Sequence, residues 1–329
     1  MSSEAVHPME FAANWTNVPF ILTDPVKQWP VYQNWSEEEL ITKHAETIFR
    51  AESVDWPLKT YIGYMNNNTD ESPLYLFDRG FAEKMNLKID HDGDYWIPDC
   101  FGEDLFAVLD DRRPDSRWLI VGPARSGSTF HKDPNATSAW NAVLRGSKYW
   151  IMFPASPSLP PPPGVFVSRD QSEVTSPLSI AEWLIAFHAE ARHTPGCIEA
   201  ICNEGEILHV PSGWWHLVVN LEPSIALTQN FVPKAHLIEV LKFLRDKPNQ
   251  VSGFPQSVKD PYLLFVEQMQ SRHPDLIASA LDKINQTTNS KKRRWESVVD
   301  KSDTLSSADK QFSDGFKFGF GGEDNEDIP

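Results

Sequence analysis

Residues 118–233 restrict the fold of this chain more than any other segment, because they read as a series of short strands. The segment begins with the apolar run Trp118–Val121 and ends with Ile225–Phe231, and glycine, proline and asparagine separate the runs between them. Many short strands divided by such turn residues are typical of an antiparallel sandwich or barrel. We therefore predict a mainly β core with flanking helices.

One interruption of this core runs from Ser156 to Asn203. Its four consecutive prolines, Pro160–Pro163, favour an extended polyproline loop. Further on, Ser179 with Glu182 three residues later predicts the start of a helix, because such a pair caps free backbone amides. The proline run is either a stiff surface loop or a docking segment, and the sequence leaves both readings open.

The regions on either side of the core have their own patterns. Residues 1–117 mix helical and extended signals: Ser36 begins a capped helix and Leu58–Tyr64 reads as a strand, so we predict an N-terminal α/β region that packs on the core. Residues 234–284 predict C-terminal helices and leave a homodimer through them open. The polar residues 285–329 are expected to be a disordered tail, in which Lys291–Arg294 reads equally as a nuclear localisation signal or a solvated charge cluster.

The charge balance indicates which partners the chain attracts. Among its 329 residues, 46 acidic and 30 basic side chains give a formal net charge of −16. This argues against nucleic acid or an anionic membrane as the main partner and favours a basic, Lys- or Arg-rich protein segment. With three cysteines, no secretory signal pattern and no apolar run of membrane-spanning length, we expect a nuclear or cytoplasmic protein.

A His-x-Asp pair, His131 and Asp133, indicates a metal site inside the β core. Residues i and i+2 of a strand point the same way, so both side chains can reach one ion. A mononuclear non-haem iron site needs two imidazoles and one carboxylate on one face of the metal. A second such pair, His273 and Asp275, contains a proline in a helical context and is expected to begin a helix instead.

His216 is the predicted third ligand, because it precedes the later strand Leu217–Leu221. A histidine beside two tryptophans is also typical of a histidine that packs in the protein core and binds no metal. Thr228 and Asn230, however, are polar residues on one face of an apolar strand, and the short connection before that strand would place His216 on the same face. A polar interior face requires a ligand to offset its cost.

Lys148 completes the predicted pocket. If the chain from Ser138 to Phe153 is a hairpin that turns at Arg145 and Gly146, Val143 pairs with Lys148 and Asn141 lies diagonal to it. Lys148 is then either a surface charge or an interior cation that needs an anion. A dicarboxylate that chelates iron at one end and pairs with Lys148 at the other satisfies both the metal and the lysine.

These residues resemble the pattern of the Jumonji-C family of Fe(II)/2-oxoglutarate oxygenases, especially its lysyl hydroxylases and proposed arginine demethylases. The resemblance spans roughly residues 10–280. It is carried by the ordered blocks Ser72–Asp78, Gly122–Gly127, His131–Ala142, Gly146–Trp150, Val210–His216 and Asn220–Phe231. Ser156–Val174, with the proline run, departs from these relatives and leaves the client protein open.

The resemblance implies a double-stranded β-helix, a jelly-roll of the cupin-like kind, over residues 118–233. It implies that His131, Asp133 and His216 bind Fe(II) and are the catalytic residues. The residues that it implies for binding 2-oxoglutarate are Tyr75, Asn141, Lys148, Thr228 and Asn230. O2 and 2-oxoglutarate are the implied cosubstrates.

The reaction that the resemblance implies first is hydroxylation of a lysyl side chain in a protein. Hydroxylation of an N-methyl group on a histone or other protein, which releases formaldehyde, is the demethylase variant. A tRNA or RNA nucleoside hydroxylase uses the same core, but the charge of −16 counts against it. A non-catalytic cupin-like binding module requires a broken ligand set, and here all three ligands are present.

Overall fold

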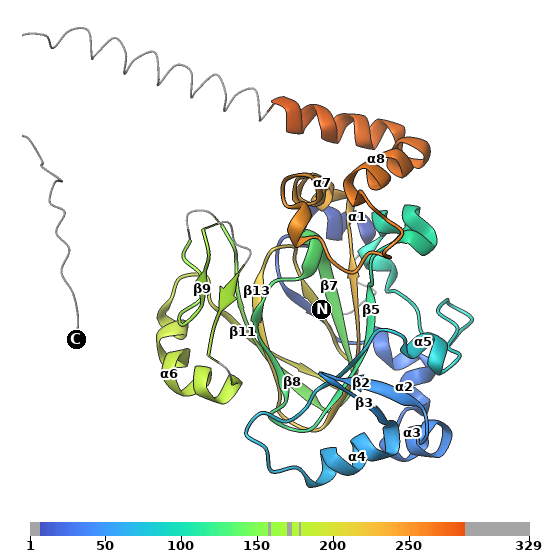
Figure 1. Ribbon diagram of the computed structural model, residues 1–329, viewed down its shortest axis with the longest axis vertical. Coiled ribbons are helices and arrows are strands. Elements are labelled where there is room, and N and C mark those ends of the chain that lie inside the picture. The colour runs from blue at the N-terminus through green and yellow to red at the C-terminus, as the bar shows by residue number, and fades with distance from the viewer. Residues whose placement is uncertain (1–6, 157–158, 170–172, 178, 287–329) are drawn as a thin grey trace, which may run out of the picture. The chain divides into compact units, whose positions relative to one another are not determined.

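The computed structural model describes residues 7–156, 159–169, 173–177 and 179–286 (Figure 1). In this described part, eight strands form one sheet in the order β1-β12-β7-β14-β5-β4-β2-β3, and four form a second in the order β11-β8-β13-β6. The larger sheet comprises β1 (Phe20–Leu22), β2 (Ile48–Ala51), β3 (Val54–Pro57), β4 (Leu76–Asp78), β5 (Arg117–Gly122), β7 (Ser138–Arg145), β12 (Ile207–Val210) and β14 (Ser224–Phe231). The smaller comprises β6 (Gly127–His131), β8 (Ser147–Phe153), β11 (Ile198–Asn203) and β13 (Trp215–Asn220).

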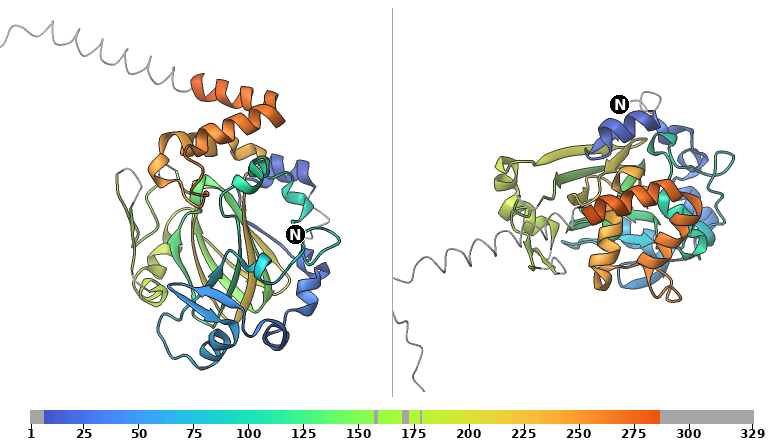
Figure 2. Two further views of the ribbon diagram at one scale, coloured as in Figure 1. Left: turned by 45° about the vertical axis from the view of Figure 1, so that its right-hand side comes forward. Right: turned by 90° about the horizontal axis from the view of Figure 1, so that it is seen from above.

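The strands of both sheets pair antiparallel, and the two sheets enclose a common interior (Figures 1 and 2). Side chains from both sheets meet there: Ala139 and Val143 of β7 pack with Trp150 of β8 and Val218 of β13. This is the antiparallel jelly-roll arrangement, and it confirms the predicted mainly β class with flanking helices.

The predicted hairpin between Ser138 and Phe153 is wrong, because β7 and β8 belong to different sheets. The turn at Gly146 instead carries the chain from one sheet to the other, and Lys148 lies in register with Cys202 and Asn220. Gly146 has φ +79°, and a Cβ atom there would lie 2.3 Å from the carbonyl oxygen of Pro223. The same crossing separates β13 from β14, so these two strands face each other across the interior instead of sharing one face.

The N-terminal residues supply helices that cover the outer face of the larger sheet. α3 (Glu37–His44) begins with the predicted capping box of Ser36 and Glu39. The strand predicted at Leu58–Tyr64 is wrong: the structure has α4 (Leu58–Asn67) there, whose buried residues Leu58, Tyr61, Ile62 and Met65 recur at helical spacing. The other helical elements of this region are α1 (Pro8–Glu10), η2 (Phe11–Trp15), η3 (Pro25–Gln28), α2 (Pro30–Asn34), α5 (Phe81–Lys84), η4 (Asp99–Phe101) and η5 (Leu105–Arg112).

The insertion after β8 forms a small layer beside the four-stranded sheet (Figure 1). It contains the short pair β9 (Phe166–Val167) and β10 (Val174–Thr175), then α6 (Ile180–His193), which Ser179 caps as predicted. Trp183 of α6 packs against Phe130 with ring centroids 4.9 Å apart and donates a hydrogen bond to the Pro163 carbonyl. The end of the proline run is therefore attached to α6.

Two helices, α7 (Leu237–Asp246) and α8 (Pro261–Arg272), lie across one end of the strands beside η6 (Pro134–Ala136) and η5 (Figure 2). Between β14 and α8 lie η7 (Lys234–His236) and η8 (Pro248–Gln250).

Residues 274–286 are helical, so the second His-x-Asp pair does sit at a helix start, with His273 beside Glu103. Among the described residues no helix has the length and apolarity needed to cross a bilayer. From residue 287 on, the predicted tail and its basic cluster lie outside the described residues.

Candidate metal centre and cosubstrate cavity

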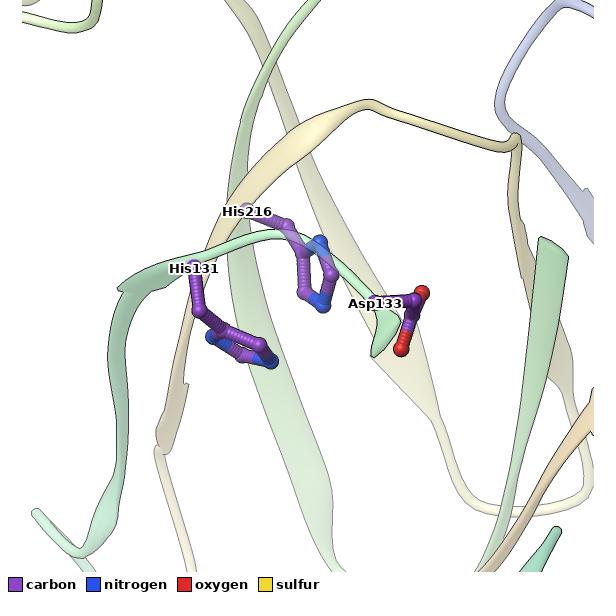
Figure 3. A group of neighbouring side chains, drawn as sticks. All are labelled: His131, Asp133 and His216. Carbon is purple, nitrogen blue, oxygen red and sulfur yellow. The ribbon is translucent and has the colours of Figure 1, made fainter. Parts of the chain in front are cut away.

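His131, Asp133 and His216 come together where β6 meets β13 (Figure 3). His131 is the last residue of β6 and lies in register with His216 on β13. Asp133 follows two residues later and precedes η6, so the chain has already left the strand there. One ligand atom from each of the three side chains lies within 4.8 Å of the others, and the two imidazole centroids are 4.1 Å apart.

The backbone fixes how both imidazoles present their nitrogens. Nδ1 of His131 lies 2.8 Å from the Thr129 carbonyl oxygen, and Nδ1 of His216 lies 3.1 Å from that of Trp214. A carbonyl only accepts, so in each ring Nδ1 carries the hydrogen and Nε2 keeps a free lone pair. Imidazoles that bind metals are oriented in this way by a partner on the other nitrogen.

Asp133 provides the test of whether a metal fits. Its Oδ1 accepts a hydrogen bond from Asn230 Nδ2 at 3.1 Å, whereas its Oδ2 is buried without a hydrogen-bond partner in the described structure. Burial raises the pKa of Asp133, and burial together with the neighbouring His131 imidazole holds the pKa of His216 well below its usual value. A carboxylate oxygen without a partner beside two free imidazole lone pairs is an environment that a divalent cation would complete.

A cavity of about 210 Å³ opens from these three side chains into the barrel. Four of the predicted cosubstrate residues, Tyr75, Asn141, Thr228 and Asn230, line it. Asn141 is buried, and its Oδ1 has no partner among the described residues. Thr228 donates its hydroxyl hydrogen to the Trp140 carbonyl at 2.8 Å, so that hydrogen is already used within the protein.

Lys148, the fifth predicted cosubstrate residue, is fully buried behind the cavity wall instead of lining it. Its amine donates to three neutral groups: the Tyr75 hydroxyl at 2.8 Å, Asn220 Oδ1 at 2.7 Å and Ser224 Oγ at 2.9 Å. No described carboxylate lies within 4.0 Å of it. Burial lowers the pKa of Lys148 to about 7.

Two outer cavities also reach His131. The first, of about 440 Å³, is lined by Glu52, Glu71 and Arg125 as well as His131. The second, of about 470 Å³, is lined by His131 and Asp133 together with Lys132 and Lys247. The candidate metal centre therefore lies where two outer cavities meet the inner one.

Residues 39–236, more than half of the chain, match the family described as cupin-like domains. The chain belongs to the cupin-like domain family. Cupin-like barrels hold ligands inside the barrel, which is where the polar side chains described above lie. The predicted resemblance to the Jumonji-C oxygenases is confirmed by the relatives that the chain matches.

Three of these relatives illustrate the match. The arginine-specific demethylase JMJ22 of Arabidopsis thaliana is 41% identical over 88% of this chain and 57% of its own length. The bifunctional arginine demethylase and lysyl-hydroxylase psr-1 of Caenorhabditis elegans is 34% identical over 79% and 64%. The 2-oxoglutarate and iron-dependent oxygenase JMJD4 of Danio rerio is 33% identical over 59% and 46%. This chain thus spans less than two thirds of each relative.

Of the three groups that hold Lys148, the sequence analysis singled out Tyr75 but not Asn220 or Ser224. Asn220 and Ser224 end one apolar strand and begin the next, and each lies at the crossing between the two sheets. The available signal was a polar residue at the end of a fully apolar run, which resembles an ordinary strand end. The placement of Lys132 and Lys247 on one cavity had no local signal in the sequence either, because 115 positions separate the two residues.

Proposed function

We propose that this cupin-like chain is an Fe(II)- and 2-oxoglutarate-dependent oxygenase that hydroxylates a protein side chain, with lysine as the first target. The observation that carries the proposal is the buried Oδ2 of Asp133, which has no described partner and faces an imidazole pair whose Nε2 atoms are free. A carboxylate and two imidazoles with open positions is the donor set typical of non-haem iron oxygenases.

In this proposal His131, Asp133 and His216 hold the iron. The metal and 2-oxoglutarate together would supply oxidation of a C–H bond by O2, coupled to decarboxylation of 2-oxoglutarate to succinate. The chain's own part is to fix the two imidazoles through the Thr129 and Trp214 carbonyls, and to orient Asp133 through Asn230.

The inner cavity is the proposed 2-oxoglutarate site. Lys148 contributes through the Tyr75 hydroxyl, which lies both on the cavity wall and 2.8 Å from the amine. The absence of a described carboxylate beside Lys148 supports an anionic ligand as the partner of this buried cation. Asn141 and Asn230 line the same cavity, and Thr228 contributes its oxygen as part of the wall.

Protein side chains are the proposed substrates because the names of three relatives specify lysine or arginine as the residue that they act on. The names of JMJ22 and psr-1 also favour a second candidate, removal of an N-methyl group from arginine. Both reactions begin with hydroxylation of a carbon bound to, or near, a cationic nitrogen. The acidic Glu52 and Glu71 in a cavity that reaches His131 suit such a side chain.

The test is reconstitution of the chain with Fe(II) without oxygen, followed by addition of O2, 2-oxoglutarate and a Lys- or methylarginine-containing peptide. We expect succinate, together with one added oxygen atom on lysine by mass spectrometry. Formaldehyde and loss of a methyl group would instead establish the demethylase. Turnover on RNA alone, or none with any substrate by iron-loaded protein, would contradict the proposal.

We further propose a nuclear or cytoplasmic location and a homodimer through the C-terminal helices. The three cysteines, all free in the structure, support a reducing compartment. A fluorescent fusion with and without Ala at Lys291–Arg294 tests the location, and sedimentation tests the dimer. Exclusion of the fusion from both compartments, or a monomer at all concentrations, would contradict these proposals.

A further inference from the structure

Two lysines face the second outer cavity without a described carboxylate within 4.0 Å of either amine. Lys132 lies between His131 and Asp133, two of the proposed metal ligands, and its amine lies 4.5 Å from the ring centroid of Trp215. Lys247 follows α7, with its amine 5.8 Å from the ring centroid of Phe243. Both line the cavity of about 470 Å³ that reaches His131 and Asp133.

Lys43, Lys242 and Lys259 also have no described carboxylate within 4.0 Å, but none of them lines the cavity that reaches His131 and Asp133. Five other described lysines have a carboxylate partner: Lys27, Lys59, Lys84, Lys88 and Lys234. Both cavity lysines line the same cavity, so an anion bound there would meet two positive charges. Two neighbouring cations held on aromatic rings, partly shielded from water, are stabilised when an anion lies between them.

The first outer cavity has the reverse character. Glu52 and Glu71 line it, with Arg125 as the described cation there. Each glutamate accepts one hydrogen bond within the protein, Glu52 from the Tyr75 amide at 3.2 Å and Glu71 from the Ser179 hydroxyl at 2.8 Å, which leaves a second carboxylate oxygen on each. His131 lines both cavities, so a segment lying across it would meet acidic groups on one side and lysines on the other.

We propose that Lys132 and Lys247 form an anion subsite of the substrate groove, which binds an acidic or phosphorylated residue beside the target residue of the client protein. This inference rests on the proposed function, because it takes the groove across His131 as the path of a protein substrate. It names the class of client: a segment with a cationic target residue and an anionic neighbour on one side only.

Binding of fluorescent peptides to the Mn(II)-loaded protein, measured by anisotropy without O2, tests the subsite separately from turnover. The peptides share a central lysine and carry Asp, phosphoserine or Ala two to four positions before or after it. We expect Asp or phosphoserine on one side to bind roughly tenfold tighter than Ala, and the gain to fall with added salt. The stronger of the two identifies the natural anion as a carboxylate or a phosphoryl group.

The variants are Lys132→Met and Lys247→Met, which retain the aliphatic contact with the aromatic rings. Each should remove most of the gain for the anionic peptide, whereas Lys43→Met, which removes an exposed lysine of α3, should keep it. Equal binding of the Asp, phosphoserine and Ala peptides by the unaltered protein would overturn the inference. So would a lysine-dependent affinity for an RNA oligonucleotide that exceeds the affinity for every peptide.

The proposed function fails in a different way. It fails if the iron-loaded protein forms no succinate from 2-oxoglutarate with any peptide, and in that case a lysine-dependent preference for anionic peptides still establishes the subsite. A protein that turns over 2-oxoglutarate but shows no such preference retains the proposed function and loses the subsite.

Discussion

Two ionisable groups lie at the inner cavity, Asp133 with one buried carboxylate oxygen and Lys148 fully buried, and their surroundings differ. Asp133 lines the cavity and keeps one carboxylate oxygen without a described partner, next to two imidazole lone pairs. Lys148 lies behind the wall and has three neutral oxygen acceptors. The carboxylate therefore needs a cation to complete its environment, whereas the lysine is already solvated by the protein and can also lose its proton.

This difference indicates how each region responds to a ligand. At Asp133 the protein supplies an incomplete donor set that only a cation can fill. At Lys148 the protein supplies three hydrogen-bond acceptors around an amine whose pKa is lowered to about 7. An arriving anion therefore changes the protonation of this amine more than it changes the contacts of the amine. Changes to the first region should act on metal binding, and changes to the second on the anion alone.

The largest expected effect is loss of the metal centre. Asp133→Ala and His216→Ala each remove one of three protein ligands and should abolish metal binding and metal-dependent turnover of 2-oxoglutarate. Metal content after anaerobic reconstitution and succinate formation are the measurements, with thermal unfolding to check the fold. His273→Ala, in the other His-x-Asp pair, is the matched control and should keep both properties. Wild-type turnover in either site variant would contradict the assignment of the metal centre.

Much of this site could be predicted from the sequence, because His131 and Asp133 are close neighbours and the strand pattern singles out His216. The strand pairing could not, because nothing local shows that the turn at Gly146 changes sheets instead of closing a hairpin. Four of the five predicted cosubstrate residues still line one cavity, since facing sheets and paired strands both turn alternate residues inward, whereas Lys148 lies behind the cavity wall.

The second effect concerns Lys148. Lys148 acts on the cosubstrate through its charge and the Tyr75 hydroxyl, so Lys148→Met should weaken 2-oxoglutarate binding by roughly ten- to a hundredfold. Mn(II) binding should persist, because no metal ligand changes. Calorimetric titration of the anaerobic Mn(II)-loaded protein measures both. An affinity for 2-oxoglutarate within twofold of wild type would show that Lys148 does not act on the anion.

The third effect is a pH dependence that only the Lys148 region should show. Burial lowers the pKa of Lys148 to about 7, so above pH 7 the free protein holds this amine mainly neutral. A bound dianion favours the charged amine, so binding should take up a proton, and affinity should fall by up to roughly tenfold per pH unit above 7. Titrations in buffers of different ionisation enthalpy measure the uptake. The same uptake in Lys148→Met would assign it to another group.

The smallest effect is expected at Thr228. Its hydroxyl hydrogen is already donated to the Trp140 carbonyl, so Thr228→Val removes a bond within the protein and changes one polar part of the cavity wall. We expect 2-oxoglutarate binding to weaken a few-fold, about 1 kcal/mol, together with a small loss of thermal stability. A loss as large as that of Lys148→Met would mean that the hydroxyl turns to the ligand when it binds.

The central claim is that the metal centre and the Lys148 region act on one and the same ligand. The most direct test is a calorimetric titration of 2-oxoglutarate into the anaerobic wild-type protein with and without Mn(II). The account predicts one saturable site per chain with Mn(II), and affinity at least roughly a hundredfold weaker without it. Equal affinity in the two titrations would show that the metal and the anion bind independently, and would contradict the account.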